Sequence, residues 1–172
     1  MRTTIVLIIV LLAGNITLAQ DFEGMIFGDS KSKIMNFHND AEWQDISINN
    51  PEVDTITYTG SFQELEALVE FVLIEDELVA GTYHFGDDSS EKTYAKFVDI
   101  FPKFRKEYGI PDNLHEKTKF QKAIWHIGGP HPYFIELNGG HGLVKAHFDW
   151  YEKIEDYNKE AKKVNKSSMK KK

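Results

Sequence analysis

The chain has 172 residues, no cysteine and a formal net charge of −7, and this length suffices for one domain with a sizeable core. The absence of cysteine excludes disulfides, thiol catalysis, cysteine metal sites and lipid attachment at an N-terminal cysteine. Residues 21–158 carry 12 Lys or Arg against 26 Asp or Glu, and this acidic body disfavours nucleic acid as a partner.

Residues 1–19 have the features of a secretory signal peptide. A single basic residue precedes an apolar run from Ile5 to Leu12, and Thr17 and Ala19 stand at the small-residue positions of a cut before Gln20. The run is short for a membrane span of about 20 residues, although an uncleaved anchor is the alternative. We therefore expect an exported protein with no transmembrane segment after signal removal. Export without cysteine favours the periplasm or exterior of a Gram-negative bacterium.

The remaining chain to residue 158 predicts a single α+β domain. Near its start, Ser30 is a suitable N-cap for a helix that begins at Lys31. Residues 54–85 are rich in β-branched and aromatic side chains. Turn signals at Gly60-Ser61 and at Glu75-Asp76 divide them into three antiparallel strands.

A long helix opens the second half of the domain. Aromatic and aliphatic side chains recur at helical spacing in "SEKTYAKFVDIFPKFRKEYG", and Gly109 before Pro111 ends the helix. Three further strands are expected at residues 119–127, 133–137 and 143–151. Residues 152–165 are predicted to be helical. They merge into a basic tail, residues 159–172, which is expected to be disordered or a frayed helix.

The two halves match each other in sequence. "ELVAGTYHF" (Glu77 to Phe85) aligns with "GLVKAHFDW" (Gly142 to Trp150), and each β-rich block follows a helix. This order predicts two tandem α-β-β-β units, about residues 22–86 and 87–151, which form an antiparallel sheet with the helices packed on one face. Chance similarity between alternating strands is the alternative.

Three motifs together resemble those of uncharacterised exported bacterial proteins. They are "FEGMIFGDSKSKI" near the mature start, the strand "LVAGTYHF", and the F-x-x-x-Y-G-I-P end of the long helix. The layout is similar to the tandem helix-plus-sheet repeats of β-lactamase-inhibitor-protein-like domains and of small outer-membrane assembly lipoproteins. The resemblance implies a non-enzymatic binding or assembly role. The missing N-terminal cysteine departs from the lipoproteins.

A cluster of histidines raises the question of a metal or catalytic site. The stretch "WHIGGPHPYFIELNGGHGLVKAHFDW" contains His126, His131, His141 and His147. A hairpin with Gly139-Gly140 at its tip would pair Ile135 with Val144. It leaves His126 and His147 on outward positions two strands apart, about 10 Å, and puts the other two histidines in opposite turns. Zinc ligands must converge within about 2.1 Å of the metal, so we predict no metal site. Cysteine is absent and no Gly-x-Ser-x-Gly elbow surrounds a serine, and we also predict no catalytic residue and no cofactor.

The most informative surface is the sheet face opposite the predicted core. We expect it to bind a protein or another envelope component, since apolar side chains on a wet face mark partner surfaces. The candidate binding residues are Phe71, Leu78, His84, Phe134, Lys145 and His147. Coverage of this face by the terminal helix is the structural alternative. Other functions remain open, namely a hydrolase or metal-dependent enzyme that uses His126, His131 or His147, and a small-ligand carrier with a pocket between the repeats.

Overall fold

The computed structural model describes residues 22–47, 52–87, 90–117, 120–129, 131–140 and 143–169. The predicted signal peptide and His141 lie outside the described residues. Among the helices of the described part, none combines the length and the apolar character needed to cross a membrane.

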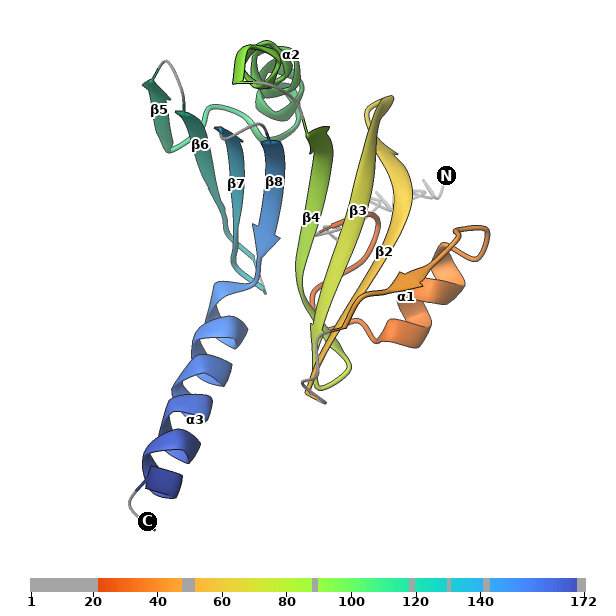
Figure 1. Cartoon of the computed structure of the whole chain (residues 1–172), viewed down its shortest axis with the longest axis vertical. Coiled ribbons are helices and arrows are strands. Elements are labelled where there is room, and N and C mark those ends of the chain that lie inside the picture. Colours follow the sequence, from red (N-terminus) through yellow and green to blue (C-terminus); the bar gives the residue numbers. More distant parts are fainter. Residues whose placement is uncertain are drawn as a thin grey trace, which may run out of the picture.

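One antiparallel sheet of eight strands organises the molecule (Figure 1). Its strands are β1 Gln44–Asp45, β2 Val53–Phe62, β3 Leu65–Ile74, β4 Glu77–Asp87, β5 Asn113–Lys117, β6 Phe120–Ile127, β7 Tyr133–Gly140 and β8 Leu143–Asp149. Their spatial order is β1-β2-β3-β4-β8-β7-β6-β5, so the two halves of the chain meet where β4 pairs with β8. The predicted α+β class is confirmed. Each half contributes four strands rather than the predicted three. The additional strands β1 and β5 were not predicted because they are short, exposed edge strands without an alternating pattern.

The helix α2, Ser90–Tyr108, covers one face of the sheet, which we call the inner face. Side chains that alternate along the strands are buried on it, including Val69, Tyr83, Phe148, Ile135 and Trp125. From α2, Phe97, Ile100 and Phe104 are buried in the same core. The helix ends as predicted at Gly109, which has φ 84°. The carbonyl of Gly109 accepts a hydrogen bond from Trp125 Nε1 at 3.0 Å.

The short helix α1, Lys31–Phe37, begins where the sequence predicts. The Ser30 side chain accepts a hydrogen bond from the backbone N–H of Lys33 at 3.3 Å. This bond satisfies one of the free amides at the helix start. Ile34 is fully buried in the inner core, which fixes α1 against the same face as α2.

The segment before α1 fills the centre of the inner face. The ring of Phe22 lies over Gly81 of β4, and its centroid is 4.9 Å from that of Tyr83. The next residue, Glu23, accepts hydrogen bonds from the hydroxyls of Tyr58 at 3.0 Å and Tyr83 at 2.5 Å. Burial and the adjacent Glu23 carboxylate both raise the pKa of these phenols. The N-terminal segment is therefore an integral part of the core.

The third helix, α3, lies on the opposite face, which we call the outer face. It spans Tyr151–Met169, and Ile154 and Tyr157 pack against Ile74 and Val79 in a second apolar cluster. Beyond this contact α3 extends away from the sheet (Figure 1). The helices of the two predicted units, α1 and α2, thus share one face, whereas the terminal helix α3 packs on the other. The amphipathic start of α3 buries its apolar side on the end of the outer face where β3 turns into β4.

The first predicted hairpin turn is misplaced by three residues. The turn between β2 and β3 consists of Gln63 and Glu64, whose φ angles are 46° and 70°. Gly60 lies inside β2, where an added Cβ would sit 2.8 Å from Tyr58 Cε2 and 2.9 Å from Val69 Cγ2. Glycine occurs at this position because two larger side chains need the space, not because the chain turns.

The predicted tip at Gly139-Gly140 is also wrong. Gly139 pairs with Val144 inside the β7–β8 ladder, so Ile135 pairs with Phe148 and not with Val144. A Cβ on Gly139 would lie 3.0 Å from Cδ2 of Phe97, which explains the glycine by the close approach of α2. The register differs from the prediction by four residues. An even shift keeps every side chain of β7 and β8 on its predicted face, so the inner face of these two strands was correctly assigned.

Candidate functional site

Four of the six predicted binding residues lie on the outer face, namely His84, Phe134, Lys145 and His147. The prediction is wrong for Phe71 and Leu78, which have no exposed surface and belong to the inner core. Phe71 pairs with Gly81 beneath the ring of Phe22, at a centroid distance of 5.2 Å. The sequence of β3 could have predicted this face for Phe71. Glu66 and Glu70 are charged and must face water, and they alternate with the buried positions of the strand.

A row of mostly polar side chains crosses the outer face at right angles to the strands. Consecutive backbone pairs join Thr59, Leu68, His84, Lys145, Asn138 and Lys122. We call these six residues the basic row. With strands about 4.8 Å apart, the row extends roughly 24 Å across the sheet.

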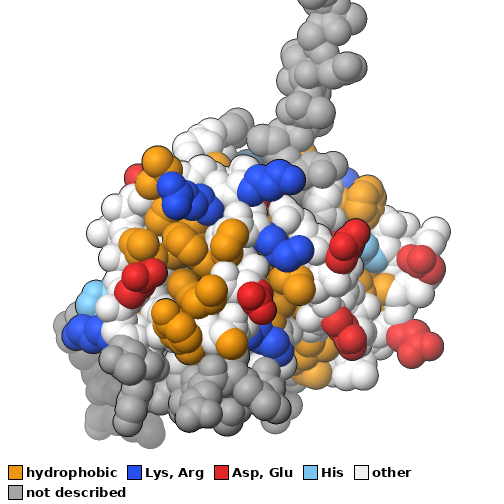
Figure 2. Space-filling view, turned by 90° about the horizontal axis from the view of Figure 1, so that it is seen from above, with side chains coloured by type: hydrophobic (Ala, Val, Ile, Leu, Met, Phe, Trp, Pro, Cys, Tyr) orange, Lys and Arg blue, Asp and Glu red, His pale blue; other side chains and the backbone are white. Residues whose placement is uncertain are grey.

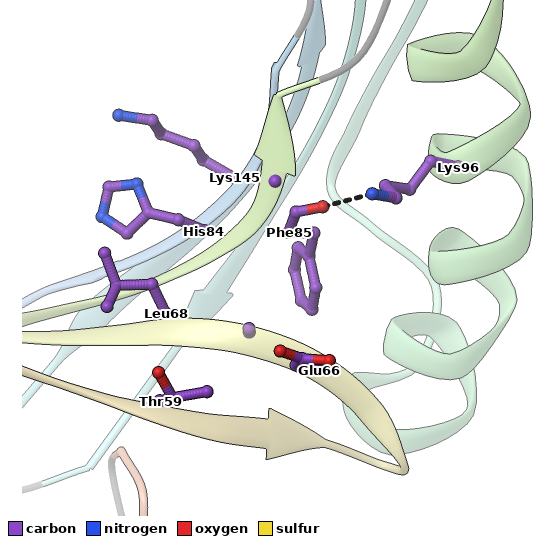
Figure 3. Close-up of a pocket in the computed structure, with 9 residues that line it drawn as sticks. Thr59, Glu66, Leu68, His84, Phe85, Lys96 and Lys145 are labelled. Carbon is purple, nitrogen blue, oxygen red and sulfur yellow. Dashed lines mark hydrogen bonds between the residues drawn. The ribbon is translucent and has the colours of Figure 1, made fainter. Parts of the chain in front are cut away.

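The surface along the basic row is hollowed on both sides of Lys145. One hollow, of about 610 Å³, is lined by residues of four strands and α2, including Leu68, His84, Lys96 and Lys145. Figure 3 shows Lys145, His84 and Leu68 on the same side of the sheet, while Lys96 reaches from α2 to the carbonyl of Phe85. A second hollow, of about 390 Å³, is lined by Lys122, Asn138 and Lys145 among others. Lys145 belongs to both.

A second row lies two residues further along each strand on the same face and contains acidic side chains. It consists of Thr57, Glu70, Thr82, His147, Glu136 and Ile124, and we call it the acidic row. The two glutamates lie on either side of the central Thr82–His147 pair. Each of them contacts a cationic or titratable member of the basic row.

Glu136 is held by two donors from the basic row. Lys122 Nζ lies 2.5 Å from Glu136 Oε2, and Asn138 Nδ2 donates to Glu136 Oε1 at 2.6 Å. Burial alone would raise the pKa of Glu136, but these two hydrogen bonds outweigh burial, and the pKa lies below its usual value. Lys122 is therefore committed to an internal partner.

Glu70 occupies the matching position in the other half. His84 Nε2 lies 3.4 Å from Glu70 Oε2, within ion-pair distance but outside hydrogen-bond geometry. This contact lowers the pKa of Glu70. Both glutamates thus contact a side chain of the basic row.

His147 at the centre of the acidic row accepts or donates one hydrogen bond through Nδ1, 3.1 Å from Thr82 Oγ1. Burial disfavours the protonated ring, Lys145 adds a repulsion, and the pKa of His147 is lowered below 6.5. His147 is therefore neutral at neutral pH, and Lys145 supplies the positive charge nearest to the central pair.

The remaining histidines do not join this site. His126 Nδ1 lies 2.9 Å from Asp112 Oδ2, at the far side of the sheet. The ring of His131 contacts Trp150 at a centroid distance of 4.7 Å. The structure thus does not bring His126, His131 and His147 together. Among the described residues, no group of three histidine or carboxylate side chains is placed to hold a metal ion.

Asp149 gives the outer face a testable pH dependence. It lies between Ala80 and Phe134 on the neighbouring strands, and burial, followed by repulsion from Glu136, raises its pKa from 3.8 to about 6. A raised carboxyl pKa means that the folded protein binds this proton more tightly than the unfolded chain. Its contribution to the free energy of unfolding is complete below about pH 4 and is lost as the pH rises through 6.

We therefore predict that Asp149→Asn stabilises the protein by about 1–3 kcal/mol above pH 7, with no gain below pH 4. Urea unfolding at several pH values measures this difference directly. An equal gain at both ends of the pH range would contradict the burial of an ionisable carboxyl at this position.

A second exposed apolar region lies on α2. Figure 2 looks onto the end of the molecule where α2 lies and shows hydrophobic side chains gathered among charged ones. Tyr94 and Val98 of α2 are 51% and 47% exposed, although their spacing places them next to the buried stripe of the helix. Neither Tyr94 nor Val98 lines the two hollows beside Lys145.

No protein-family model, no curated protein and no solved structure matches this chain. The geometry of the outer face is therefore the basis on which we infer a function.

Proposed function

We propose that this protein is an exported, non-enzymatic binding protein whose outer face docks a macromolecular partner, a protein or another envelope component. The observation that carries the proposal is the hollowed surface on both sides of Lys145, which α3 leaves uncovered because it packs only at one end of the face. Leu68 lies in this surface with 40% of its area exposed. An apolar side chain beside paired and unpaired charges is the usual composition of a docking surface.

The size of the face supports a macromolecular partner. The six strands that the two rows cross span roughly 24 Å, and strands of seven residues are about 24 Å long. Their product, about 600 Å², is of the order of the area, about 800 Å², that one partner contributes to a standard protein interface. A shallow open face of this extent suits a folded or extended chain.

The chemistry of the face supports binding over catalysis. Glu136, Lys122 and Asn138 satisfy one another, and Glu70 pairs with His84. Groups that bond to one another in this way form a fixed surface, whereas proton transfer needs an acid and a base directed at one reacting atom. The three histidines of the alternative enzymatic hypothesis contact Asp112, Trp150 and Thr82 separately.

We further propose that the two halves are tandem copies of one unit. In chain order, α1 with β1 to β4 is followed by α2 with β5 to β8, and the sheet order is the same from either edge to the β4–β8 seam. The sequence match makes Thr82 and His147 equivalent, and these two residues pair with each other. Glu70 and Glu136 then occupy equivalent positions beside that pair. Duplication thus accounts for a face wider than either half could form.

A matched pair of variants tests the docking surface. Leu68→Glu on the outer face is expected to reduce recovery of the partner from an envelope extract at least tenfold, because a charge replaces an exposed apolar contact. Val98→Glu on α2 makes the same change at similar exposure, 47% against 40%, and should leave recovery unchanged. Melting curves of the two variants control for folding. Loss of the partner with Val98→Glu and its retention with Leu68→Glu would move the binding surface to α2.

A further inference from the structure

The smaller hollow beside Lys145 is lined by polar side chains and one aromatic ring. Its volume of about 390 Å³ lies in the range of small-ligand pockets, about 300–1,000 Å³. Phe120 is half-buried and supplies the aromatic wall. The core of a protein interface is usually apolar, with few charged side chains. A hollow of this composition therefore suits a polar ligand better than the anchor residue of a protein.

Both donors and acceptors remain free in this hollow. Lys122 Nζ directs one of its three N–H groups to Glu136, and Glu136 accepts from Lys122 and Asn138 at two of about four lone-pair positions. The side chains of Lys122 and Glu136 keep 30% and 32% of their area exposed. Within the described part of the chain, Lys145 forms no ion pair and no side-chain hydrogen bond, although its charge acts through space on Glu70 and His147. A ligand in the hollow thus meets ammonium donors and a carboxylate acceptor together.

The charges on this face disfavour a ligand of either sign. An anion at Lys145 would lie beside Glu136 and would face Glu66 and Glu70 across the larger hollow. A cation would be repelled by Lys145 and Lys122 in the same way. A neutral ligand meets neither repulsion.

We infer that the outer face binds a neutral, hydroxyl-rich saccharide chain, with sugar rings in the two hollows on either side of Lys145. This inference rests on the proposed function, because it names the class of envelope component that docks on the same face. A hydroxyl group donates and accepts at one atom, so it can donate to Glu136 while it accepts from Lys145 or Lys122. An amide needs two separate atoms for the same pair of bonds. The ring of Phe120 can cover the apolar C–H face of a sugar.

The arrangement of the two hollows fits a chain of sugars. Glu136 is held from two sides by Lys122 and Asn138, so these side chains lose little freedom when a ligand binds. The larger hollow, of about 610 Å³, repeats the mixture of groups, since Lys145, Glu66 and Leu68 supply a donor, an acceptor and an apolar wall (Figure 3). A saccharide that crosses Lys145 reaches both hollows.

The experiment uses the purified full chain and three neutral hexasaccharides, namely maltohexaose, cellohexaose and chitohexaose, with binding measured by isothermal titration calorimetry. We expect at least one of them to bind the wild type. Its affinity should change less than twofold between about 50 and 500 mM NaCl, because the ligand carries no charge for salt to screen.

Two matched variants locate the binding surface. Lys145→Met removes the donors and keeps most of the side-chain length, and it should weaken saccharide binding at least tenfold. Lys106→Met makes the same change at an exposed position in the last turn of α2 and should alter binding less than twofold. Circular dichroism of each variant confirms that it is folded.

Four results would overturn the inference. The first is equal weakening by Lys145→Met and Lys106→Met, and the second is a loss of affinity above tenfold over the same salt range, which indicates an ionic contact. The third is equal binding of an uncharged Gly-Ser hexapeptide, and the fourth is no binding of any of the three hexasaccharides. The proposed function is judged separately. If Leu68→Glu abolishes partner recovery while no hexasaccharide competes with that recovery, the face is correct and the saccharide is wrong.

Discussion

Phe22→Ala is expected to lower the free energy of unfolding by about 3–5 kcal/mol. Phe22 is almost completely buried, and its ring centroid lies 4.9 to 5.2 Å from those of Tyr83, Phe148 and Phe71. Removal of the ring leaves a cavity between three aromatic side chains that the sheet holds in place. Because β-strands on both sides of the β4–β8 seam line this cavity, the structure can collapse onto it only in part.

Phe37→Ala provides the control for this prediction. Phe37 is the last residue of α1 and is 57% exposed, so its truncation should change stability by less than about 0.5 kcal/mol. Urea unfolding of both variants gives the comparison. Equal small effects would show that the N-terminal segment is not anchored in the core.

The position of Phe22 also makes the expected processing site informative. A cut before Gln20 would leave two residues ahead of Phe22, so the chain that remains would keep the ring and the adjacent Glu23. Glu23 accepts hydrogen bonds from Tyr58 and Tyr83, and its loss would leave two largely buried hydroxyls unsatisfied. A cut only a few residues later would therefore remove part of the core.

The sequence was most informative where alternation and capping act locally. The cap at Ser30, the end of α2 at Gly109 and the inner face of β7 and β8 follow from side chains close in the chain. The turns were less predictable, since Gln63 and Glu64 adopt positive φ without glycine. Gly60 and Gly139 resemble turn residues in the sequence but are required by neighbouring side chains distant in the chain.

The candidate site was predictable only in part for the same reason. His84, Lys145 and His147 were assigned to the outer face by alternation alone, which a register error of four residues does not alter. The basic row depends on the true register, because it is the pairing of Lys145 with His84 and Asn138 that places them side by side. Phe71 was assigned to the wrong face, although it alternates regularly with the buried residues Val69 and Leu73 of the same strand.

Gly81→Ala is the second change with a large expected effect. A Cβ at this position would lie 2.1 Å from Cδ1 and 2.5 Å from Cγ of Phe22, far closer than any tolerated contact. The clash involves the body of a buried aromatic ring and not the end of a flexible side chain, so the ring must move out of its site. We expect the free energy of unfolding to fall by about 1–3 kcal/mol, as in other overpacked cores.

The double variant Phe22→Ala/Gly81→Ala separates this clash from any general cost of changing β4. Once the ring is absent, the new methyl group occupies vacated space and no longer causes strain. The double variant should therefore be as stable as Phe22→Ala alone, within about 0.5 kcal/mol, and a double-mutant cycle should give a coupling energy of about 1–3 kcal/mol. Simple additivity of the two losses would mean that Phe22 and Gly81 are not in contact in solution. Coupling of the expected size would place the N-terminal segment over the β4–β8 seam, because Gly81 pairs with Phe71 on one side and with Phe148 on the other.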